Sequence, residues 1–263
     1  MHTQAPVGIF DSGFGGLSVA RAVRTRLPGE NLCYAADCGG APWGDRTDNY
    51  IHRRVDVIVD FLLSRQVKAI VIACNTATAV TVKRLREELK LPIIGIEPAV
   101  MLAARETRSR HIGVLATTKT LSSQKYHHLC NRTAEDLHVF DCPCPGLMDC
   151  VEAGDMDSPA TMALLHRYID PLIDQGVDTL VLGCTHYPFL ASAIRQVAGP
   201  GVTLIDPAPA VARQLERRLA ETGLLSDKKN GGTEVFYSTD ANPVREKVLQ
   251  TLWDPASRLL NIE

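Results

Sequence analysis

Two cysteines occupy matching places in this sequence. Cys74 follows the apolar run 69–73, and Cys184 follows the similar run 179–183. Each run is short and aliphatic, as is typical of a buried strand, and each is followed by small polar residues and a helical pattern. The carboxyl ends of parallel strands are where open α/β sheets bind ligands, and a helix N-terminus stabilises a thiolate. We therefore predict that Cys74 and Cys184 face one substrate from opposite sides.

Two opposed thiols are suited to proton transfer at a carbon atom. One thiolate removes a proton while the other thiol delivers one to the opposite face. The ordinary pKa of a thiol is about 8.5, far below that of an α-carbon acid, and each unit of the difference costs about 1.4 kcal/mol. The site must therefore stabilise the carbanion with fixed hydrogen bonds in a dry cleft. Suitable uncharged donors are the amides of the glycine loop 13–16 and the side chains of Ser12, Asn75, Thr76, Thr117 and Thr185.

Three ionisable residues are candidates for assisting the thiols. Asp11 ends the first expected strand, where it either caps the next helix or exchanges a proton with a cleft thiol. His186 either tunes Cys184, two residues before it, or is a hydrogen-bonded residue at a helix start. Glu152 has no distinguishing pattern of its own. A Cys-His-acid set also fits acyl transfer, but that chemistry leaves one cysteine unused.

The glycine loop 13–16 fits an anion site better than a dinucleotide site. A G-x-G-x-x-G fingerprint needs glycine at position 18, which is Ser18, and the sequence contains no Gly-Lys-Ser/Thr phosphate loop. We expect these glycines to let the backbone approach a small anionic ligand at a helix N-terminus. Cys142, Cys144 and Cys150 lack the spacing of paired C-x2-C zinc ligands, and we expect no metal site.

Composition and charge limit the possible partners. The chain has 263 residues, of which 45% are hydrophobic and 22% charged, as in an ordinary globular protein. A formal net charge of −2 does not support binding to nucleic acid or to an anionic membrane surface. No apolar run approaches the ~20 residues of a membrane helix, and the first six residues lack the features of a signal peptide. We therefore expect a cytoplasmic protein with its eight cysteines as thiols.

The elements that position these residues alternate between strand and helix. This βαβ alternation predicts mainly parallel sheets with right-handed crossovers. An acid-Pro-Ala segment follows each key cysteine, with Pro98 24 residues after Cys74 and Pro207 23 residues after Cys184, which favours an internal duplication. We expect strands at 7–10, 32–36, 91–96, 111–115, 137–140 and 202–205, and one in each of the runs that end at Cys74 and Cys184. After the strand at 111–115 we expect one helix that ends at about residue 131.

We predict an α/β fold with two pseudo-symmetric, doubly wound domains and the active site in the cleft between them. The first domain comprises residues 1–98 and 210–263, and the second comprises residues 99–209. The last stretch adds a helix, a strand at 234–238 and a final helix. Because it has no sheet of its own, we expect it to pack back onto the first domain.

Three segments resemble signature segments of the aspartate/glutamate racemase family, and of glutamate racemases within it. They are Gly8–Val19 (GIFDSGFGGLSV), Ala73–Ala77 (ACNTA) and Gly183–Pro188 (GCTHYP), and the resemblance extends over nearly the whole chain. It implies a cofactor-independent enzyme that interconverts L- and D-glutamate for bacterial peptidoglycan, usually as a homodimer.

The resemblance also implies roles for individual residues. Cys74 would take the α-proton of D-glutamate and Cys184 that of L-glutamate. Asp11 would assist Cys74, while Glu152 and His186 would assist Cys184. Substrate contacts would come from Ser12, Pro42, Trp43, Gly44, Asn75, Thr76, Thr117, Thr120 and Thr185.

Some positions depart from the family's pattern. Trp43 stands where the family has tyrosine, so any role of a phenol hydroxyl is lost, and the match around Glu152 is short. The sequence lacks the N-terminal extension linked to activation by a wall precursor in some members, so we expect no such activator. Two alternatives stay open: racemization of aspartate or another amino acid by the same chemistry, and a two-domain protein that binds an amino acid without turnover.

Overall fold

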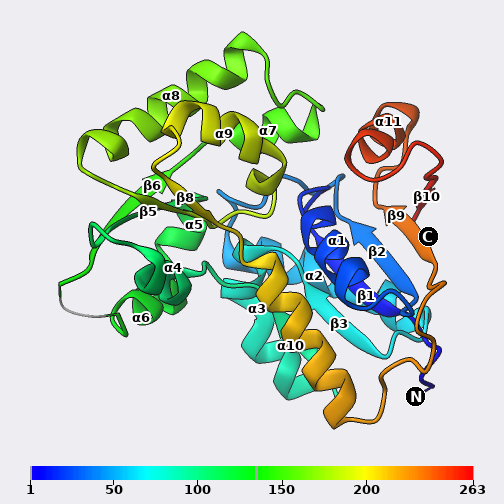
Figure 1. Cartoon of the computed structure of the whole chain (residues 1–263). Coiled ribbons are helices and arrows are strands. Elements are labelled where there is room, and N and C mark those ends of the chain that lie inside the picture. Colours follow the sequence, from blue (N-terminus) through cyan, green and yellow to red (C-terminus); the bar gives the residue numbers. More distant parts are fainter. Residues whose placement is uncertain (1, 134–135, 263) are drawn as a thin grey trace.

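The strands of the chain form two separate parallel sheets (Figure 1). The computed structural model describes residues 2–133 and 136–262. A six-stranded sheet has the order β10-β9-β2-β1-β3-β4, and a four-stranded sheet has the order β6-β5-β7-β8. The strands are β1 Val7–Asp11, β2 Leu32–Ala36, β3 Ala69–Ile72, β4 Ile93–Gly95, β5 His111–Ala116, β6 His138–Pro143, β7 Thr179–Leu182, β8 Thr203–Ile205, β9 Glu234–Ser238 and β10 Leu259–Asn261. The predicted α/β class with mainly parallel sheets is confirmed.

The two sheets repeat one connectivity. In the first sheet β1 pairs with β2 and β3, and β3 pairs with β4. In the second, β5 pairs with β6 and β7, and β7 pairs with β8. Numbered from the start of each half, both sheets therefore have the order 2-1-3-4. This repeat agrees with the pseudo-symmetry predicted from the two cysteine segments.

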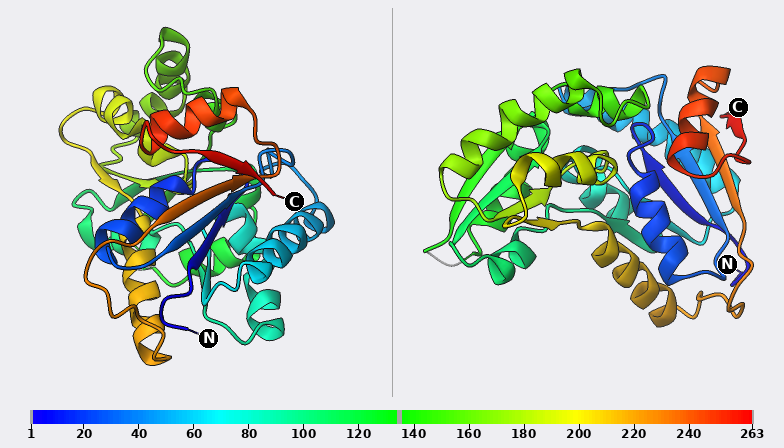
Figure 2. Two further views of the ribbon diagram at one scale, coloured as in Figure 1. Left: turned by 90° about the vertical axis from the view of Figure 1, so that its right-hand side faces the viewer. Right: turned by 45° about the horizontal axis from the view of Figure 1, so that its top comes forward.

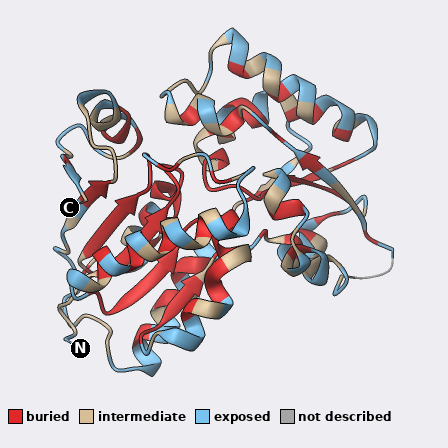
Figure 3. Ribbon diagram, turned by 180° about the vertical axis from the view of Figure 1, so that it is seen from behind, coloured by how far each residue is buried: buried red, intermediate tan, exposed pale blue. Residues whose placement is uncertain are grey.

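Helices cover the faces of the buried strands, and their outward-facing sides are exposed (Figure 3). The helices are α1 Leu17–Arg26, α2 Asp48–Ser64, α3 Asn75–Glu88, α4 Val100–Glu106, α5 Thr118–Leu121, α6 Gln124–Cys130, α7 Leu147–Glu152, α8 Pro159–Asp174, η1 Tyr187–Leu190 (3-10), α9 Ala191–Ala198, α10 Ala208–Glu221 and α11 Pro243–Leu252. Among the described residues, none of them combines the length and the apolar character required to cross a membrane.

One helix expected after β5 is two helices in the structure. α5 ends at Leu121, and α6 begins only after Ser123, whose side chain accepts a hydrogen bond from the Tyr126 amide. A serine in this N-cap position competes with continuation of a helix, which explains the break. The short helix α4 and the strand β10 were not expected from the sequence.

The segment after α10 extends the first sheet. β9 pairs with β2, and β10 pairs with β9. Together with α11 these strands lie on the side of the first sheet that faces away from the second sheet (Figure 2). The chain thus returns to the first sheet after completing the second, whereas the boundaries at 98/99 and 209/210 stay a prediction.

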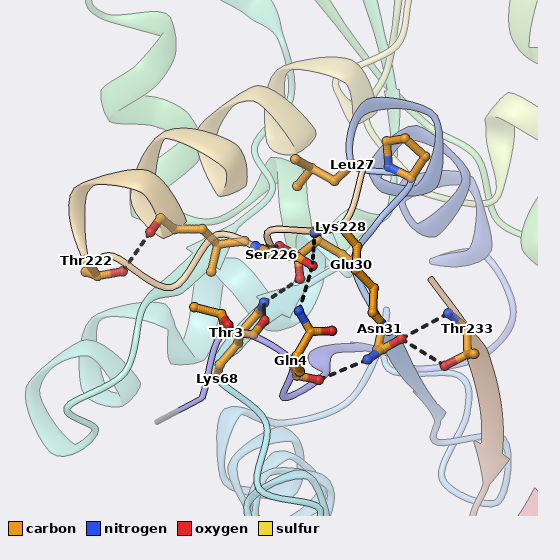
Figure 4. A network of polar contacts seen from close by, with 12 residues as sticks. Thr3, Gln4, Leu27, Glu30, Asn31, Lys68, Thr222, Ser226, Lys228 and Thr233 are labelled. Carbon is orange, nitrogen blue, oxygen red and sulfur yellow. Dashed lines mark hydrogen bonds and ion pairs between the residues drawn. The ribbon is translucent and has the colours of Figure 1, made fainter. Parts of the chain in front are cut away.

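A buried ion pair anchors the connection between α10 and β9 (Figure 4). Lys68 and Glu30 are each at most 1% exposed, and their Nζ and Oε2 atoms lie 2.5 Å apart. The Lys68 ammonium also donates to the Thr3 carbonyl, and the Ser226 amide donates to Glu30 Oε1 at 2.7 Å. Because Glu30 and Lys68 precede β2 and β3, this network fastens the N-terminus and the 222–233 loop to the amino ends of the strands.

Candidate active site

The carboxyl ends of strands from both sheets meet at one small cavity. Cys74 follows β3 in the first sheet and Cys184 follows β7 in the second, and both line this cavity. Its lining consists of Asp11, Ser12, Gly44, Cys74, Asn75, Thr76, Thr117, Met148, Gly183, Cys184, Thr185 and His186. Residues 110 positions apart are thus brought to one site because each ends the same strand of the repeated sheet.

Cys74 sits at the start of α3, where the helix begins as expected. Its sulfur accepts a hydrogen bond from the Ala77 amide at 3.4 Å and lies 4.0 Å from Ser12 Oγ. Burial, together with the charge of Asp11, nevertheless raises the pKa of Cys74 well above its usual value. The thiol form therefore predominates until a neighbouring base takes its proton.

Asp11 is the base best placed beside Cys74. Its carboxylate is fully buried, and burial raises its pKa even though the nearby His186 and the Gly16 and Ser12 amides oppose that shift. Oδ2 accepts from the Gly16 amide at 2.6 Å and from Thr185 Oγ1 at 3.4 Å. Oδ1 has no hydrogen-bond partner, so it is available to accept a proton.

Cys184 is supported by a different arrangement. Its sulfur lies 3.5 Å from His186 Nδ1, and His186 Nε2 lies 2.7 Å from Glu152 Oε1. No α-helix begins directly after Cys184, because the chain first forms the 3-10 turn 187–190. The expectation that a helix N-terminus stabilises the Cys184 thiolate is thus wrong. The group that contacts this sulfur is the His186 imidazole.

The His186 ring is held between a thiol and a carboxylate. Burial lowers the pKa of His186, but its contacts with Cys184 and Glu152 outweigh burial and raise that pKa well above the usual value. Burial raises the pKa of Glu152, and the His186 hydrogen bond reverses this effect, leaving the pKa below its usual value. An imidazolium paired with an ionised Glu152 is therefore the stable state of this side of the cavity.

The glycine loop 13–16 binds the protein's own acid and base groups. The Phe14 amide donates to Glu152 at 2.6 Å, the Gly15 amide approaches His186 Nε2 at 3.2 Å, and the Gly16 amide donates to Asp11. The Phe14 and Gly16 amides are therefore not free to bind a ligand, whereas Nε2 of an imidazolium carries its own proton and cannot accept from the Gly15 amide. The prediction of a ligand-binding glycine loop is therefore wrong for the Phe14 and Gly16 amides, because the anionic groups that they meet are the side chains of Glu152 and Asp11.

Glycine is required in this loop because the backbone lies directly against these side chains. A Cβ atom at Gly15 would lie 2.5 Å from His186 Cε1, and one at Gly16 would lie 2.7 Å from Asp11 Cβ. The Tyr34 hydroxyl donates to the Gly13 carbonyl at 2.7 Å and holds the loop from behind. One loop thus contacts the groups beside both thiols.

The side chain of Asn75 is free to contact a ligand. Asn75 is 5% exposed, it lines the cavity, and neither atom of its amide has a hydrogen-bond partner. A buried amide without partners costs about 1–3 kcal/mol, which a bound ligand recovers. Next to it, the Thr76 and Thr117 hydroxyls lie 3.0 Å apart, and Thr120 supports both from behind at 3.4 and 3.0 Å.

The Pro42-Trp43-Gly44 segment reaches the cavity through its glycine. Trp43 is buried behind the cavity, and its Nε1 donates to Asp37 Oδ2 at 3.1 Å. The same carboxylate is paired with the Arg54 guanidinium. Gly44 lines the cavity, whereas Pro42 and Trp43 are outside its lining. The indole therefore acts by positioning the loop that carries Gly44.

Two residues of the lining were not singled out from the sequence. Met148 comes from α7, four residues before Glu152, where the sequence pattern is weakest. Gly183 directly precedes Cys184, and a Cβ there would lie 2.9 Å from the Leu115 carbonyl oxygen. The position of Gly183 was a usable signal, since glycine before a strand-end residue marks close approach of two backbones.

The cavity is closed around a very small volume. It measures about 10 Å³, which is room for about one water molecule. An amino acid is much larger, so lining side chains or the corners of the two sheets must move to admit one. Among the described residues, no three His, Cys, Asp or Glu side chains are grouped so that they could hold a metal ion.

Comparisons with known proteins show similarity to one family over nearly the whole chain. Residues 19–215 match the model of the Asp/Glu/hydantoin racemase family. The glutamate racemase of Methylococcus capsulatus is 48% identical over 254 residues, which are 97% of this chain and 94% of that protein. A glutamate racemase isoform of Bacillus anthracis has a TM-score of 0.89 at 33% identity, over 100% of this chain and 98% of its own. Escherichia coli glutamate racemase, solved with L-glutamate and the activator UDP-MurNAc-Ala, has a TM-score of 0.87 at 32% identity, over 97% of each chain.

Proposed function

This chain belongs to the Asp/Glu/hydantoin racemase family, and we propose that it interconverts L- and D-glutamate by a two-thiol mechanism without a cofactor. The observation that carries the mechanism is the presence of Cys74 and Cys184, from corresponding strands of two repeated sheets, in one cavity. The substrate follows from the relatives, which are named glutamate racemases at 48–50% identity over more than nine tenths of this chain.

Cys74 acts on D-glutamate. Asp11 takes the proton of the Cys74 thiol, and the resulting thiolate removes the α-proton of the substrate. Asp11 suits this step because burial raises its pKa, which makes it a stronger base than an exposed carboxylate. Its unpartnered Oδ1 is the atom that receives the proton.

Cys184 completes the reaction from the other sheet. Its thiol gives a proton to the opposite face of the α-carbon, and the thiolate left behind is stabilised by the His186 imidazolium 3.5 Å away. Glu152 keeps that imidazolium charged through Nε2. In the reverse direction the same thiolate removes the α-proton of L-glutamate, and Cys74 returns one.

Neutral donors stabilise the carbanion between the two thiols. Asn75, Ser12, Thr76, Thr117 and Thr185 line the cavity, and they provide amide and hydroxyl groups for the substrate's polar atoms. Each well-placed donor of this kind contributes about 10²–10³-fold to kcat. Gly44 adds a close backbone approach, while Trp43 anchors its loop to Asp37 and Thr120 holds the Thr117 hydroxyl. Pro42 is exposed outside the lining.

Circular dichroism of the purified chain tests the substrate. The signal of L-glutamate should decay to zero, because equal amounts of the enantiomers are present at equilibrium, while L-aspartate should keep its signal. Decay with aspartate alone would assign the chain to aspartate racemization, and no decay with either would leave a binding protein.

Serine variants test the two-thiol mechanism. Cys74→Ser and Cys184→Ser should each abolish racemization, since a hydroxyl is a far weaker base than a thiolate. Cys150→Ser is the matched control, because Cys150 is on α7 outside the cavity lining. Near-normal turnover of either cavity variant would contradict the mechanism, and solvent deuterium incorporated at the α-carbon would report the proton transfer directly.

We propose that the enzyme works as a homodimer in the cytoplasm, where D-glutamate is used for peptidoglycan. The nature of the relatives, which are bacterial glutamate racemases, supports this setting. Light scattering coupled to gel filtration measures the mass in solution, and a mass of one chain at working concentration would refute the dimer.

A further inference from the structure

Two thiols outside the cavity are in contact with each other. Cys142 and Cys144 lie at the end of β6, on either side of Pro143, and their sulfurs are 3.8 Å apart. Alternate residues of an extended strand point to the same face, which explains why the two thiols meet. Among the described residues, no other two cysteines share a thiol–thiol hydrogen bond.

The two thiols are not equivalent. The Cys144 thiol contacts both the Cys142 carbonyl oxygen, at 3.2 Å, and the Cys142 sulfur. This contact from Cys144 lowers the pKa of Cys142 against the opposing effect of burial, so Cys142 is the better nucleophile of the pair. It is also the more accessible one, at 9% exposed against 3% for Cys144.

We propose that Cys142 and Cys144 form a redox modification site, at which a hydroperoxide converts the dithiol to a disulfide. The Cys142 thiolate attacks one peroxide oxygen, the O–O bond breaks, and Cys142 becomes a sulfenic acid. The other oxygen takes up a proton and leaves as an alcohol or as water. The Cys144 thiol then attacks the sulfenic sulfur, which forms the S–S bond and releases water. Two thiols are oxidised and one hydroperoxide is reduced, so the step needs no other reactant.

The distances allow this reaction with local movement. The sulfurs must approach from 3.8 Å to about 2.05 Å, which requires rotation of the two side chains and adjustment of the short strand end. β6 ends at Pro143, so Cys144 lies just beyond the strand and closure bends the chain at the strand end.

Closing the disulfide would displace residues next to the catalytic cavity. The Cys144 amide donates to the Ala116 carbonyl at 3.1 Å, and its own carbonyl accepts from the Tyr187 hydroxyl at 3.3 Å. Ala116 directly precedes Thr117, and Tyr187 directly follows His186. This coupling rests on the proposed function, whereas formation of the disulfide does not.

The disulfide itself is tested in the chain that lacks both cavity thiols. The Cys74→Ser/Cys184→Ser variant is treated with hydrogen peroxide, and the proteolytic fragment that contains Cys142 and Cys144 is weighed. We expect this fragment to lose two hydrogen atoms and to regain them with dithiothreitol. Sulfinic or sulfonic acid at Cys142 without a disulfide, or an unchanged fragment, would overturn the proposal.

The coupling is tested by activity. Wild type is oxidised in saturating D-glutamate, which covers the cavity thiols, and we expect turnover to fall by about tenfold, since small misplacements of catalytic groups cost up to about 10²-fold. Dithiothreitol should restore it. Cys144→Ser, which keeps both backbone hydrogen bonds, should lose less than about twofold under the same treatment, as should a Cys142→Ser chain. Equal losses in all three chains would refute the coupling while leaving the proposed racemization intact.

Discussion

Replacing Gly15 by alanine displaces His186 without removing any functional group. The added Cβ would lie 2.5 Å from Cε1 and 2.6 Å from Cγ of the ring, whereas carbon atoms in contact are ordinarily about 3.5–4.0 Å apart. The ring or the loop must therefore move by about 1 Å. Neither is free to do so, because Glu152 holds the ring and Tyr34 holds the loop.

We expect a large loss of kcat/KM together with a moderate loss of folding free energy. Overpacking of this kind costs about 1–3 kcal/mol of folding free energy, which lowers Tm by about 2–4 °C per kcal/mol in a chain of this size. A 1 Å misplacement of a catalytic group costs about 10²-fold in rate. Because the two enantiomers have equal free energies, kcat/KM must fall by the same factor in both directions.

The assay is circular dichroism of glutamate in each direction, together with thermal unfolding of the same protein. Gly201→Ala is the matched control, since a Cβ at Gly201 meets nothing within 4 Å, and it should keep both activity and Tm. Wild-type kcat/KM in Gly15→Ala would refute the role assigned to the contact between this loop and His186.

Three further predictions concern charge and burial. Glu152→Gln lowers the raised pKa of His186; because the imidazolium is lost as pH rises through that pKa, the alkaline limb of kcat/KM should move to lower pH, which a profile over about pH 6–10 measures. Lys68→Met leaves Glu30 as an unpaired buried charge and should cost about 3–5 kcal/mol in urea unfolding; a loss below about 1 kcal/mol would show that the pair is not effectively buried. Trp43→Phe removes the indole donor from a buried carboxylate and should cost about 1–3 kcal/mol with a raised KM, and an unchanged KM would separate this loop from substrate binding.

Local patterns located most strands and the first helices. The strand at 32–36 was predicted with its observed bounds, and strands were predicted in the two runs that end at Cys74 and Cys184, because short aliphatic runs between polar turns leave few alternatives. The helix after β5 was predicted as one and is two, since serine caps are weak signals in a polar sequence. β10 was not predicted because three residues carry no usable periodicity.

The sequence by itself determined the repeated strand-cysteine corners and their order, and hence the parallel α/β class, since these depend on neighbours along the chain. Only the tertiary structure decided what surrounds each thiol. Glu152 reaches His186 across 34 positions, and the Gly15 amide reaches the same ring across 171. The contact between Gly15 and His186 depends on how the two sheets dock, and the packing of one sheet against another is not encoded in any local period of the sequence. The contact between Glu152 and His186 lies within the second half of the chain and depends on how α7 packs against the 3-10 turn that follows Cys184.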